Sequence, residues 1–212
     1  KRGDASGSDW VVLRSRTTIS PTEVYLRGDV VIRETGPWAP TVHSLLRHLE
    51  EVGFPASRIV GSGFDDQSRE TVRYIEGEFT QPGPWSLEGV FAVGRMLRDL
   101  HDATASYRPP PDAMWGPWFG REIGGPDRVI GHCDFVPWNI VARDGLPVAL
   151  IDWDFSGPVD PLVELAQAEW LNAKLHDDEV AVAEGLGAVE FVDGAGEGER
   201  LGVARELGEG DL

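Results

Sequence analysis

The stretch that decides the fold runs from Val129 to Phe155 and reads VIGHCDFVPWNIVARDGLPVALIDWDF. Short apolar runs alternate there with polar side chains, and Asp144-Gly145 separates the second run from the third. An Asp-Gly pair between β-rich runs is a strong hairpin signal. We therefore expect a two-stranded unit with Asn139 and Asp152 at its open end and Asp134 in the loop just before it.

These three side chains suit one kind of chemistry. Phosphoryl transfer needs a group that orients or deprotonates the attacking hydroxyl, and oxygen ligands for the Mg²⁺ that sits on the phosphates. Mg²⁺ prefers carboxylate and amide oxygens and is usually held by one or two carboxylates together with phosphate oxygens and water. The sequence thus favours Asp134 as the catalytic base, and Asn139 and Asp152 as the metal ligands.

The segments HCDFVPWN and IDWDFSGPVDPLVELA resemble the aminoglycoside phosphotransferase and choline kinase-like family, and GRMLRDLH at 94–101 is similar to a helix motif of that family. The resemblance covers Val30 to His176. It implies an α+β, two-lobed protein-kinase-like fold with a small antiparallel-sheet N-lobe (9–78) and a mainly helical C-lobe (79–212). The C-terminal part is expected to be shortened, with 177–212 loosely packed. The implied cofactors are ATP and Mg²⁺.

Local signals predict the elements. Three short strands are expected at 10–13, 24–26 and 30–33, and a hairpin at 59–63 and 69–75. Thr41 is predicted to cap a helix that Gly53 closes, and Ser86 is predicted to cap a second helix. Asp160 followed by Pro161 is a good start for a third helix. The Pro-, Gly- and Trp-rich segment 103–126 is expected either to pass near the acceptor or simply to pack.

The chain departs from the family at its phosphate-binding lysine. No lysine occurs between Lys1 and Lys174, and Arg33 stands where that lysine would align. Arginine can grip phosphate in a fork, so Arg33 is predicted either to bind the nucleotide phosphates or to be a solvated charge at a strand end. In the resembling family the lysine is paired with a glutamate on a helix. Here that ion pair is expected to be absent or to be rebuilt with Glu50 or Glu51.

Two further expectations concern nucleotide binding. The loop 17–23 contains no glycine, which disfavours close backbone contact with phosphate. By resemblance, the main chain of Tyr74, Ile75 and Glu76 is predicted to bind the adenine.

The remaining polar residues of the central stretch have mainly structural interpretations. His132 is expected to hold its loop by hydrogen bonds, and Asp154 either makes a structural hydrogen bond or reaches metal or acceptor. Cys133 is expected to be a small buried residue in preference to a nucleophile. The plainest alternative for the whole stretch is a core hairpin with solvated acids at its ends.

Composition excludes several classes of function. The formal charge of −17 over 212 residues leaves no basic stripe for nucleic acid. A single cysteine excludes an internal disulfide and a cysteine metal cluster. No apolar run is long enough to cross a bilayer and no signal peptide is recognisable, so we expect a soluble, cytoplasmic protein without a membrane partner. Its oligomeric state is left open.

Three functions are compatible with the sequence. The first is an ATP- and Mg²⁺-dependent phosphotransferase acting on a hydroxyl of a small molecule, such as an aminoglycoside-like antibiotic, an amino alcohol or a sugar. The second is a weakly active or inactive nucleotide-binding relative, suggested by Arg33. The third is a metal-dependent phosphohydrolase built on His101-Asp102, His176-Asp177 and His132.

Overall fold

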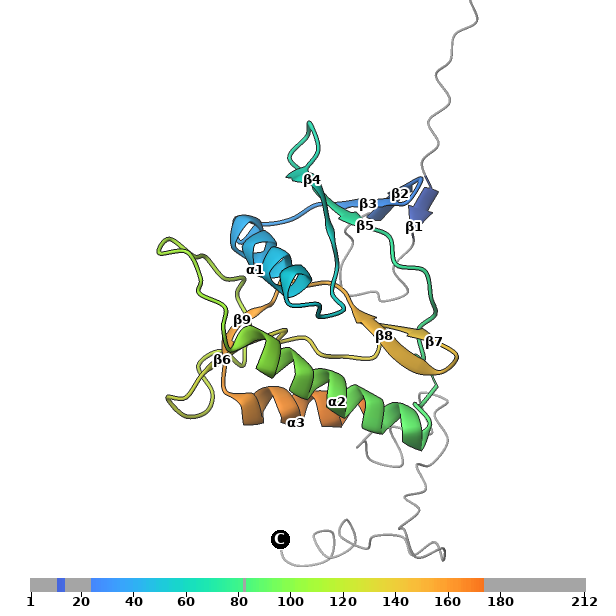
Figure 1. The fold of residues 1–212 in the computed structure, drawn as a ribbon, viewed down its shortest axis with the longest axis vertical. Helices are drawn as coiled ribbons and strands as arrows, with labels where there is room; N and C mark the ends of the chain where they lie inside the picture. Colours follow the sequence, from blue (N-terminus) through green and yellow to red (C-terminus); the bar gives the residue numbers. More distant parts are fainter. Residues whose placement is uncertain (1–10, 14–23, 82, 174–212) are drawn as a thin grey trace, which may run out of the picture.

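The computed structural model describes residues 11–13, 24–81 and 83–173 (Figure 1). The small lobe is a five-stranded antiparallel sheet in the order β1-β2-β3-β5-β4. Its strands are β1 (Val11–Leu13), β2 (Val24–Arg27), β3 (Val30–Arg33), β4 (Ile59–Phe64) and β5 (Glu70–Arg73). The expected strands are confirmed, and the sheet places β3 beside β5 although α1 and β4 separate them in the sequence.

Tight turns set the register of this sheet. Gly28, at φ +61°, allows the turn between β2 and β3, which pairs Val24 with Arg33 and Arg27 with Val30. Strand β3 then pairs with β5 so that Arg33 lies directly opposite Glu70. Directly opposed residues of an antiparallel pair project to the same face, so the two charged side chains can meet.

Helix α1 (Ala39–Glu51) packs against the sheet and begins earlier than predicted. Thr41 is not the N-cap, because the helix starts two residues before it, with Trp38 at the cap and Pro40 in the first turn. Proline suits that position because its φ is already helical and its missing N–H is not needed. The Thr41 hydroxyl instead accepts the backbone N–H of Met114 at 2.9 Å. Gly53, at φ +80°, follows the helix end as expected.

In the large lobe, residues 83–173 form two stacked helices and two small strand pairs (Figure 1). Helix α2 (Leu87–Thr104) is capped by Ser86, whose hydroxyl accepts the N–H of Gly89. Helix α3 (Pro161–Asn172) is capped by Asp160. The strand pairs are β6 (Val129–Gly131) with β9 (Gly157–Val159), and β7 (Ile140–Arg143) with β8 (Leu146–Leu150). The caps predicted at Ser86 and Asp160 and the central hairpin are therefore confirmed.

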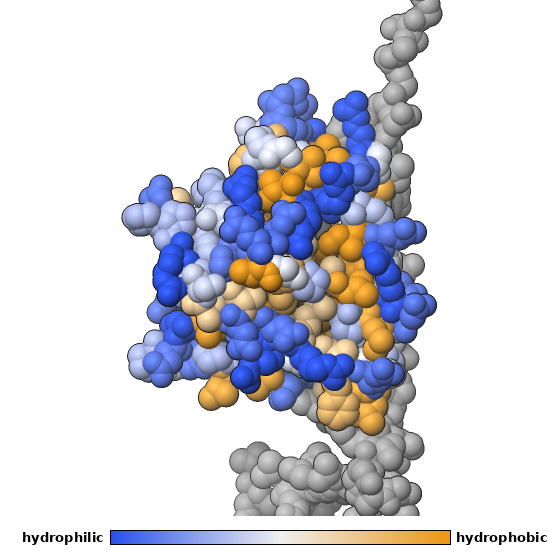
Figure 2. All heavy atoms as spheres, in the orientation of Figure 1, coloured by the Kyte–Doolittle hydropathy of each residue, from blue (hydrophilic) through white to orange (hydrophobic). Residues whose placement is uncertain are grey.

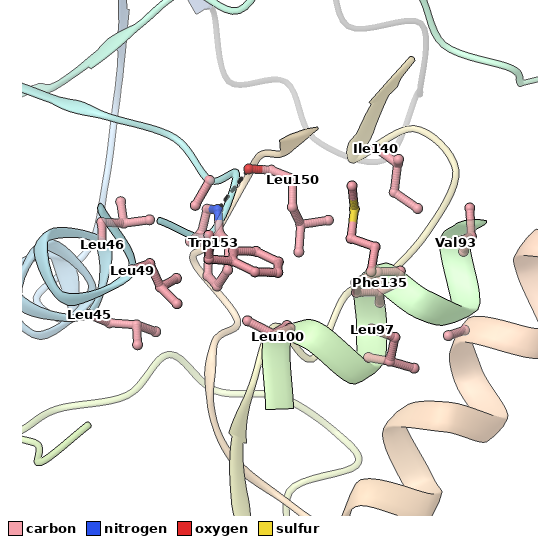
Figure 3. Packing of buried hydrophobic residues seen from close by; sticks show 14 of the residues in the cluster. Leu45, Leu46, Leu49, Val93, Leu97, Leu100, Phe135, Ile140, Leu150 and Trp153 are labelled. Atoms are coloured by element: carbon pink, nitrogen blue, oxygen red, sulfur yellow. Dashed lines mark hydrogen bonds between the residues drawn. The ribbon is translucent and has the colours of Figure 1, made fainter. Parts of the chain in front are cut away.

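One hydrophobic cluster joins the lobes (Figure 3). Leu45, Leu46 and Leu49 of α1 face Trp153, which packs edge-on against Phe54 and donates its indole N–H to the carbonyl of Leu150 at 3.0 Å. On the other side of Trp153 lie residues of α2, of the loop before β7 and of the hairpin: Val93, Leu97, Leu100, Phe135, Ile140 and Leu150. The segment that carries Asp152 and Asp154 is thereby anchored through the tryptophan between them.

The surface is largely polar, with smaller hydrophobic groups between hydrophilic ones in the view of Figure 2. Exposed large apolar side chains include Leu87 and Phe91 of α2 and Leu162 and Trp170 of α3. None of the helices in the described ranges combines the length and the apolar character needed to cross a membrane.

Candidate active site

The predicted base and one predicted metal ligand are in direct contact. Asn139 donates its side-chain amide to the carboxylate of Asp134 at 2.8 Å and to the backbone carbonyl of Asp134 at 3.0 Å. Asn139 is buried, whereas Asp134 is only partly covered. Because Asp134 takes both amide hydrogen bonds, the amide oxygen of Asn139 is the atom available to a cation.

The hairpin brings Asp152 to the same place. Ile140 pairs with Leu150 at the last rung of β7 and β8, and Ile151 donates its N–H to the carbonyl of Asn139 at 2.9 Å. Asp152 therefore lies one residue beyond the rung that holds Asn139. The charge of Asp152 also acts on Asp134, so the structure brings together all three residues predicted for the catalytic and metal roles.

The electrostatics around Asp134 disfavour its charge. Burial is the largest cause, and it raises the pKa of Asp134 above the ordinary aspartate value. The nearby charge of Asp152 adds to this rise, while His132 and the hydrogen bond from Asn139 oppose it. A carboxylate with a raised pKa is a stronger base, which suits a group that must accept or share a hydroxyl proton.

His132 and Cys133 shape the loop that carries Asp134. His132 is fully buried, its Nε2 lies 2.9 Å from the carbonyl of Ile151, and the N–H of Asp134 donates to its Nδ1 at 3.3 Å. Burial lowers the pKa of His132, which fits a neutral ring with its proton on Nε2. His132 therefore ties the base to the residue before Asp152.

Cys133 takes a left-handed backbone conformation, with φ +63°, which is strained for a residue with a side chain. The thiol is buried, and burial raises its pKa, so it lacks the thiolate character of a nucleophile. Its backbone N–H donates to the carboxylate of Glu164 at 2.7 Å. Glu164 is fully buried in α3 and also faces His101, whose Nε2 lies 2.6 Å from its second oxygen.

Arg33 is bound by carboxylates on several sides. Its Nε donates to Glu70 at 2.6 Å, one terminal nitrogen donates to Asp152 at 2.8 Å, and both terminal nitrogens donate to Asp154 at 3.0 Å. Burial works to lower the pKa of Arg33, but the three acids outweigh it and raise the pKa. Arg33 is therefore a partly buried, permanently charged link between β3 and the segment after β8, and the solvated strand-end interpretation is wrong.

The glutamate partner of Arg33 is Glu70 of β5. The expectation of Glu50 or Glu51 is wrong, because Glu50 lies beside Arg58 at 3.5 Å and Glu51 is exposed at the end of α1. Glu70 is 1% exposed, and its second oxygen lies 3.0 Å from Nε2 of His43. Burial tends to raise the pKa of Glu70, but His43 and Arg33 outweigh it and lower the pKa.

Sequence reasoning missed Glu70 and His43 for a physical reason. Glu70 and Arg33 are 37 residues apart and meet only because β3 pairs with β5. A usable signal was present, because Glu70 starts a β-rich run and acids are rare in buried strand positions unless they are paired.

The segment predicted to bind adenine already uses part of its backbone. Tyr74 donates its N–H to the carbonyl of Asp29 at 2.8 Å, and the carbonyl of Glu76 accepts from the side chain of Arg143 at 3.0 Å. Two residues on, Glu78 exchanges both backbone hydrogen bonds with Ala142. The bonds of Tyr74 and Glu76 leave the Tyr74 carbonyl and the Glu76 N–H unused, so adenine binding by the main chain of 74–76 stays a prediction. The glycine-free loop 17–23 lies outside the described residues.

Arg121 holds the Trp-rich loop against the site and was also missed. Its terminal nitrogens donate to the backbone carbonyls of Gly116, Phe155, Ser156 and Pro158. The loop thus lies beside the segment that follows Asp154, as close backbone packing of Gly116 against Asp154 also indicates. These contacts show that this part of 103–126 packs against the segment after Asp154, and its passage near the acceptor stays a prediction.

The donor set fits a hard divalent cation. Asn139 and Asp152 lie at the same end of the hairpin, the carboxylate of Asp152 is half-exposed, and one of its oxygens is bonded to Arg33. Amide and carboxylate oxygens are the ligand types that Mg²⁺ takes from protein. Within the described ranges no three histidine, cysteine, aspartate or glutamate side chains gather as a metal-binding cluster. The predicted site differs from such a cluster because it relies on an amide oxygen.

A family model described as the phosphotransferase enzyme family matches residues 121–188, which include the loop of Asp134 and the hairpin. Solved structures with similar folds include an amicoumacin kinase in complex with AMP-PNP, Ca²⁺ and its ligand (TM-score 0.61, 14% identity, 84% of this chain and 69% of that chain). An aminopropanol kinase associated with a microcompartment gives a TM-score of 0.56 at 14% identity, over 76% and 69% of the two chains.

The chain has the protein-kinase-like fold of aminoglycoside phosphotransferases and choline kinases. An aminoglycoside-3′-phosphotransferase of type VIII shares this kinase-like fold, with a TM-score of 0.52 and 18% identity over 84% of this chain and 80% of that one. The predicted α+β, two-lobed architecture and the resemblance on which it was based are therefore confirmed.

A curated relative is much more similar in sequence. The trifolitoxin immunity protein of Rhizobium leguminosarum bv. trifolii is 60% identical over 169 residues, which cover 79% of this chain. The kinase-like chain spans 65% of the length of that relative.

The groups named for a phosphohydrolase have other partners. His101 faces Glu164, and Asp102 is exposed beside Arg98. His132 contacts the backbone carbonyl of Ile151 and the backbone N–H of Asp134, and His176-Asp177 lies outside the described residues. Nothing in these contacts favours the third function.

Proposed function

We propose that this chain carries the site of a phosphotransferase that moves the γ-phosphate of ATP to a hydroxyl of a small toxin or antibiotic. The observation that carries the proposal is the grouping of Asp134, Asn139 and Asp152 at the open end of one hairpin. The kinase-like fold supports a phosphoryl transfer, and the name of the curated relative supports an acceptor that is a toxin.

The chain's own residues perform two tasks in this proposal. Asp134, with its raised pKa, accepts a hydrogen bond from the acceptor hydroxyl, orients its oxygen towards the phosphate and takes its proton. Asn139 keeps the Asp134 carboxylate in place and, with Asp152, supplies oxygen ligands. Mg²⁺ bound there would neutralise the charge on the transferred phosphate, as it does in phosphoryl transfer generally.

A second candidate is a nucleotide-binding relative that transfers phosphate poorly or not at all. The observation that favours it is the engagement of Arg33 with three carboxylates, because a cation held in this way has little capacity left for phosphate. Weaker phosphate binding would lower the rate without removing the metal site.

Turnover separates the two candidates. The purified chain is incubated with γ-labelled ATP, Mg²⁺ and a panel of hydroxylated acceptors that includes aminoglycosides, amino alcohols, sugars and hydroxylated peptide toxins. Transfer to one class, lost in Asp134→Asn, is the expected result. Binding of Mg²⁺ and ATP without transfer to any acceptor supports the second candidate, and transfer by Asp134→Asn at the parent's rate would refute the assignment of the base.

A further inference from the structure

A chain of polar contacts, buried at its α1 end and exposed at Asp152, runs from α1 to the predicted metal ligand. His43 of α1 contacts one oxygen of Glu70 at 3.0 Å, and the other oxygen of Glu70 accepts from Arg33 at 2.6 Å. Arg33 then donates to Asp152 and Asp154. His43 and Glu70 are each 1% exposed, so neither can exchange its partner for water.

We propose that Glu70 and His43 are positioning residues, which orient the Arg33 guanidinium so that it holds the Asp152 carboxylate in place for a divalent cation. The inference rests on the proposed function, because it takes Asp152 as a metal ligand. It gives Arg33 a role that differs from gripping phosphate: the arginine works on the metal site through Asp152.

The donor geometry of arginine supports this role. A guanidinium has five N–H groups in a fixed plane, and Arg33 makes four hydrogen bonds to carboxylates. Little of it is left for a phosphate. The hydrogen bond from Nε to Glu70 fixes the plane of the guanidinium. In that plane the terminal nitrogens point at Asp152 and Asp154.

The charge balance supports it as well. The carboxyl groups of Glu70, Asp152 and Asp154 all bind one guanidinium. Two negative charges therefore remain if all three acids are ionised. The charge of Arg33 holds the carboxylates of Asp152 and Asp154 close together. The net negative charge of the group attracts a divalent cation at the exposed side of Asp152.

Packing fixes His43 in turn. Its ring lies 4.7 Å from the ring of Phe64, and a Cβ at Gly63 would overlap the imidazole. Gly63 and the Phe64 ring therefore confine the imidazole of His43 beside Glu70. Outer partners of this kind typically change metal affinity or activity by about 10- to 100-fold when they are removed.

The test measures metal binding without turnover. Mn²⁺ replaces Mg²⁺ as the probe, and its binding to the whole chain with a non-hydrolysable ATP analogue is followed by electron paramagnetic resonance. Glu70→Gln and His43→Leu are expected to weaken Mn²⁺ binding by about 10- to 100-fold. His43→Gln, whose amide can replace the Nε2 donor, is expected to restore most of it. Glu51→Gln, an exposed change of the same chemistry, serves as the matched control.

Arg33→Lys tests the role of the fork and also covers the case in which Glu70→Gln fails to fold. Lysine keeps the charge but cannot span three carboxylates, so Mn²⁺ binding should fall as it does in His43→Leu. Binding equal to the parent's in Arg33→Lys, or in both Glu70→Gln and His43→Leu, would overturn the positioning role while leaving the proposed phosphotransferase intact. A parent that binds no Mn²⁺ with the nucleotide and transfers no phosphate would overturn the proposed function, and this inference with it.

Discussion

Glu164 accepts the backbone N–H of Cys133 at 2.7 Å, although the two residues are 31 positions apart and lie in different segments. Cys133 is held at φ +63° and immediately precedes Asp134. A helix side chain thus stabilises a strained backbone just before the predicted base. Such strain persists only where surrounding contacts enforce it, and Glu164 supplies one of them.

Removal of the Glu164 carboxylate should therefore cost stability and activity together. Glu164→Ala leaves the N–H of Cys133 and the ring of His101 without their buried partner, and we expect a loss of about 3 kcal/mol in the free energy of unfolding. Glu164→Gln retains an acceptor for Cys133, so its loss should be less than half as large. Urea denaturation measures both variants, and equal losses would show that the hydrogen bond to Cys133 is not the reason.

Asp134→Asn should stabilise the fold while it removes catalysis. Because the pKa of Asp134 is raised, the folded state binds its proton more tightly than the unfolded state does. The resulting stabilisation of the fold is fully present below the unfolded pKa, near 3.8, and is lost as the pH rises through the folded pKa. At neutral pH the neutral asparagine avoids the desolvation of a charge, so the variant should melt at a higher temperature than the parent.

The advantage of Asp134→Asn should also shrink as the pH falls through the raised pKa, because the parent then binds a proton in the folded state. Melting curves at a series of pH values between neutrality and pH 4 measure the difference. An advantage that stays constant over this range would contradict the assigned shift.

Arg121→Lys should loosen the Trp-rich loop. A lysine has a single ammonium group and cannot reach the carbonyls of Gly116, Phe155, Ser156 and Pro158 together. We expect a loss of about 2 kcal/mol in the free energy of unfolding and faster proteolysis within 113–126. Arg128→Lys, at an exposed arginine that donates to the carbonyl of Ile123, is the matched control and should change neither.

Two glycines isolate the effect of backbone conformation. A Cβ at Gly94 of α2 or at Gly145 of the hairpin turn meets no atom within 4 Å, so sterics between side chains play no part. Gly94 lies inside a helix, and Gly94→Ala should stabilise the fold by about 0.5 to 1 kcal/mol. Gly145 has φ +74°, and Gly145→Ala should destabilise it by about 1 kcal/mol. Changes of the same sign in chemical denaturation would contradict this reasoning.

Local sequence predicted the elements because their causes are local. Asp144 and Gly145 have φ +51° and +74°, the pair of left-handed conformations that a two-residue hairpin needs. Ser86 and Asp160 accept backbone N–H groups within three residues of themselves. The start of α1 was mispredicted at Thr41 because the N-cap residue is Trp38, whose side chain makes no capping hydrogen bond and does not mark a helix start.

The sequence by itself determined the hairpin and, through it, the grouping of Asp134, Asn139 and Asp152, because those residues lie within one short stretch. Only the tertiary structure decided what supports them. Glu70 reaches Arg33 through the pairing of β3 with β5, Glu164 reaches Cys133 from α3, and Arg121 reaches the carbonyls after Asp154 from a loop. Each of these contacts depends on how distant segments pack, which the spacing of residues along the chain does not encode.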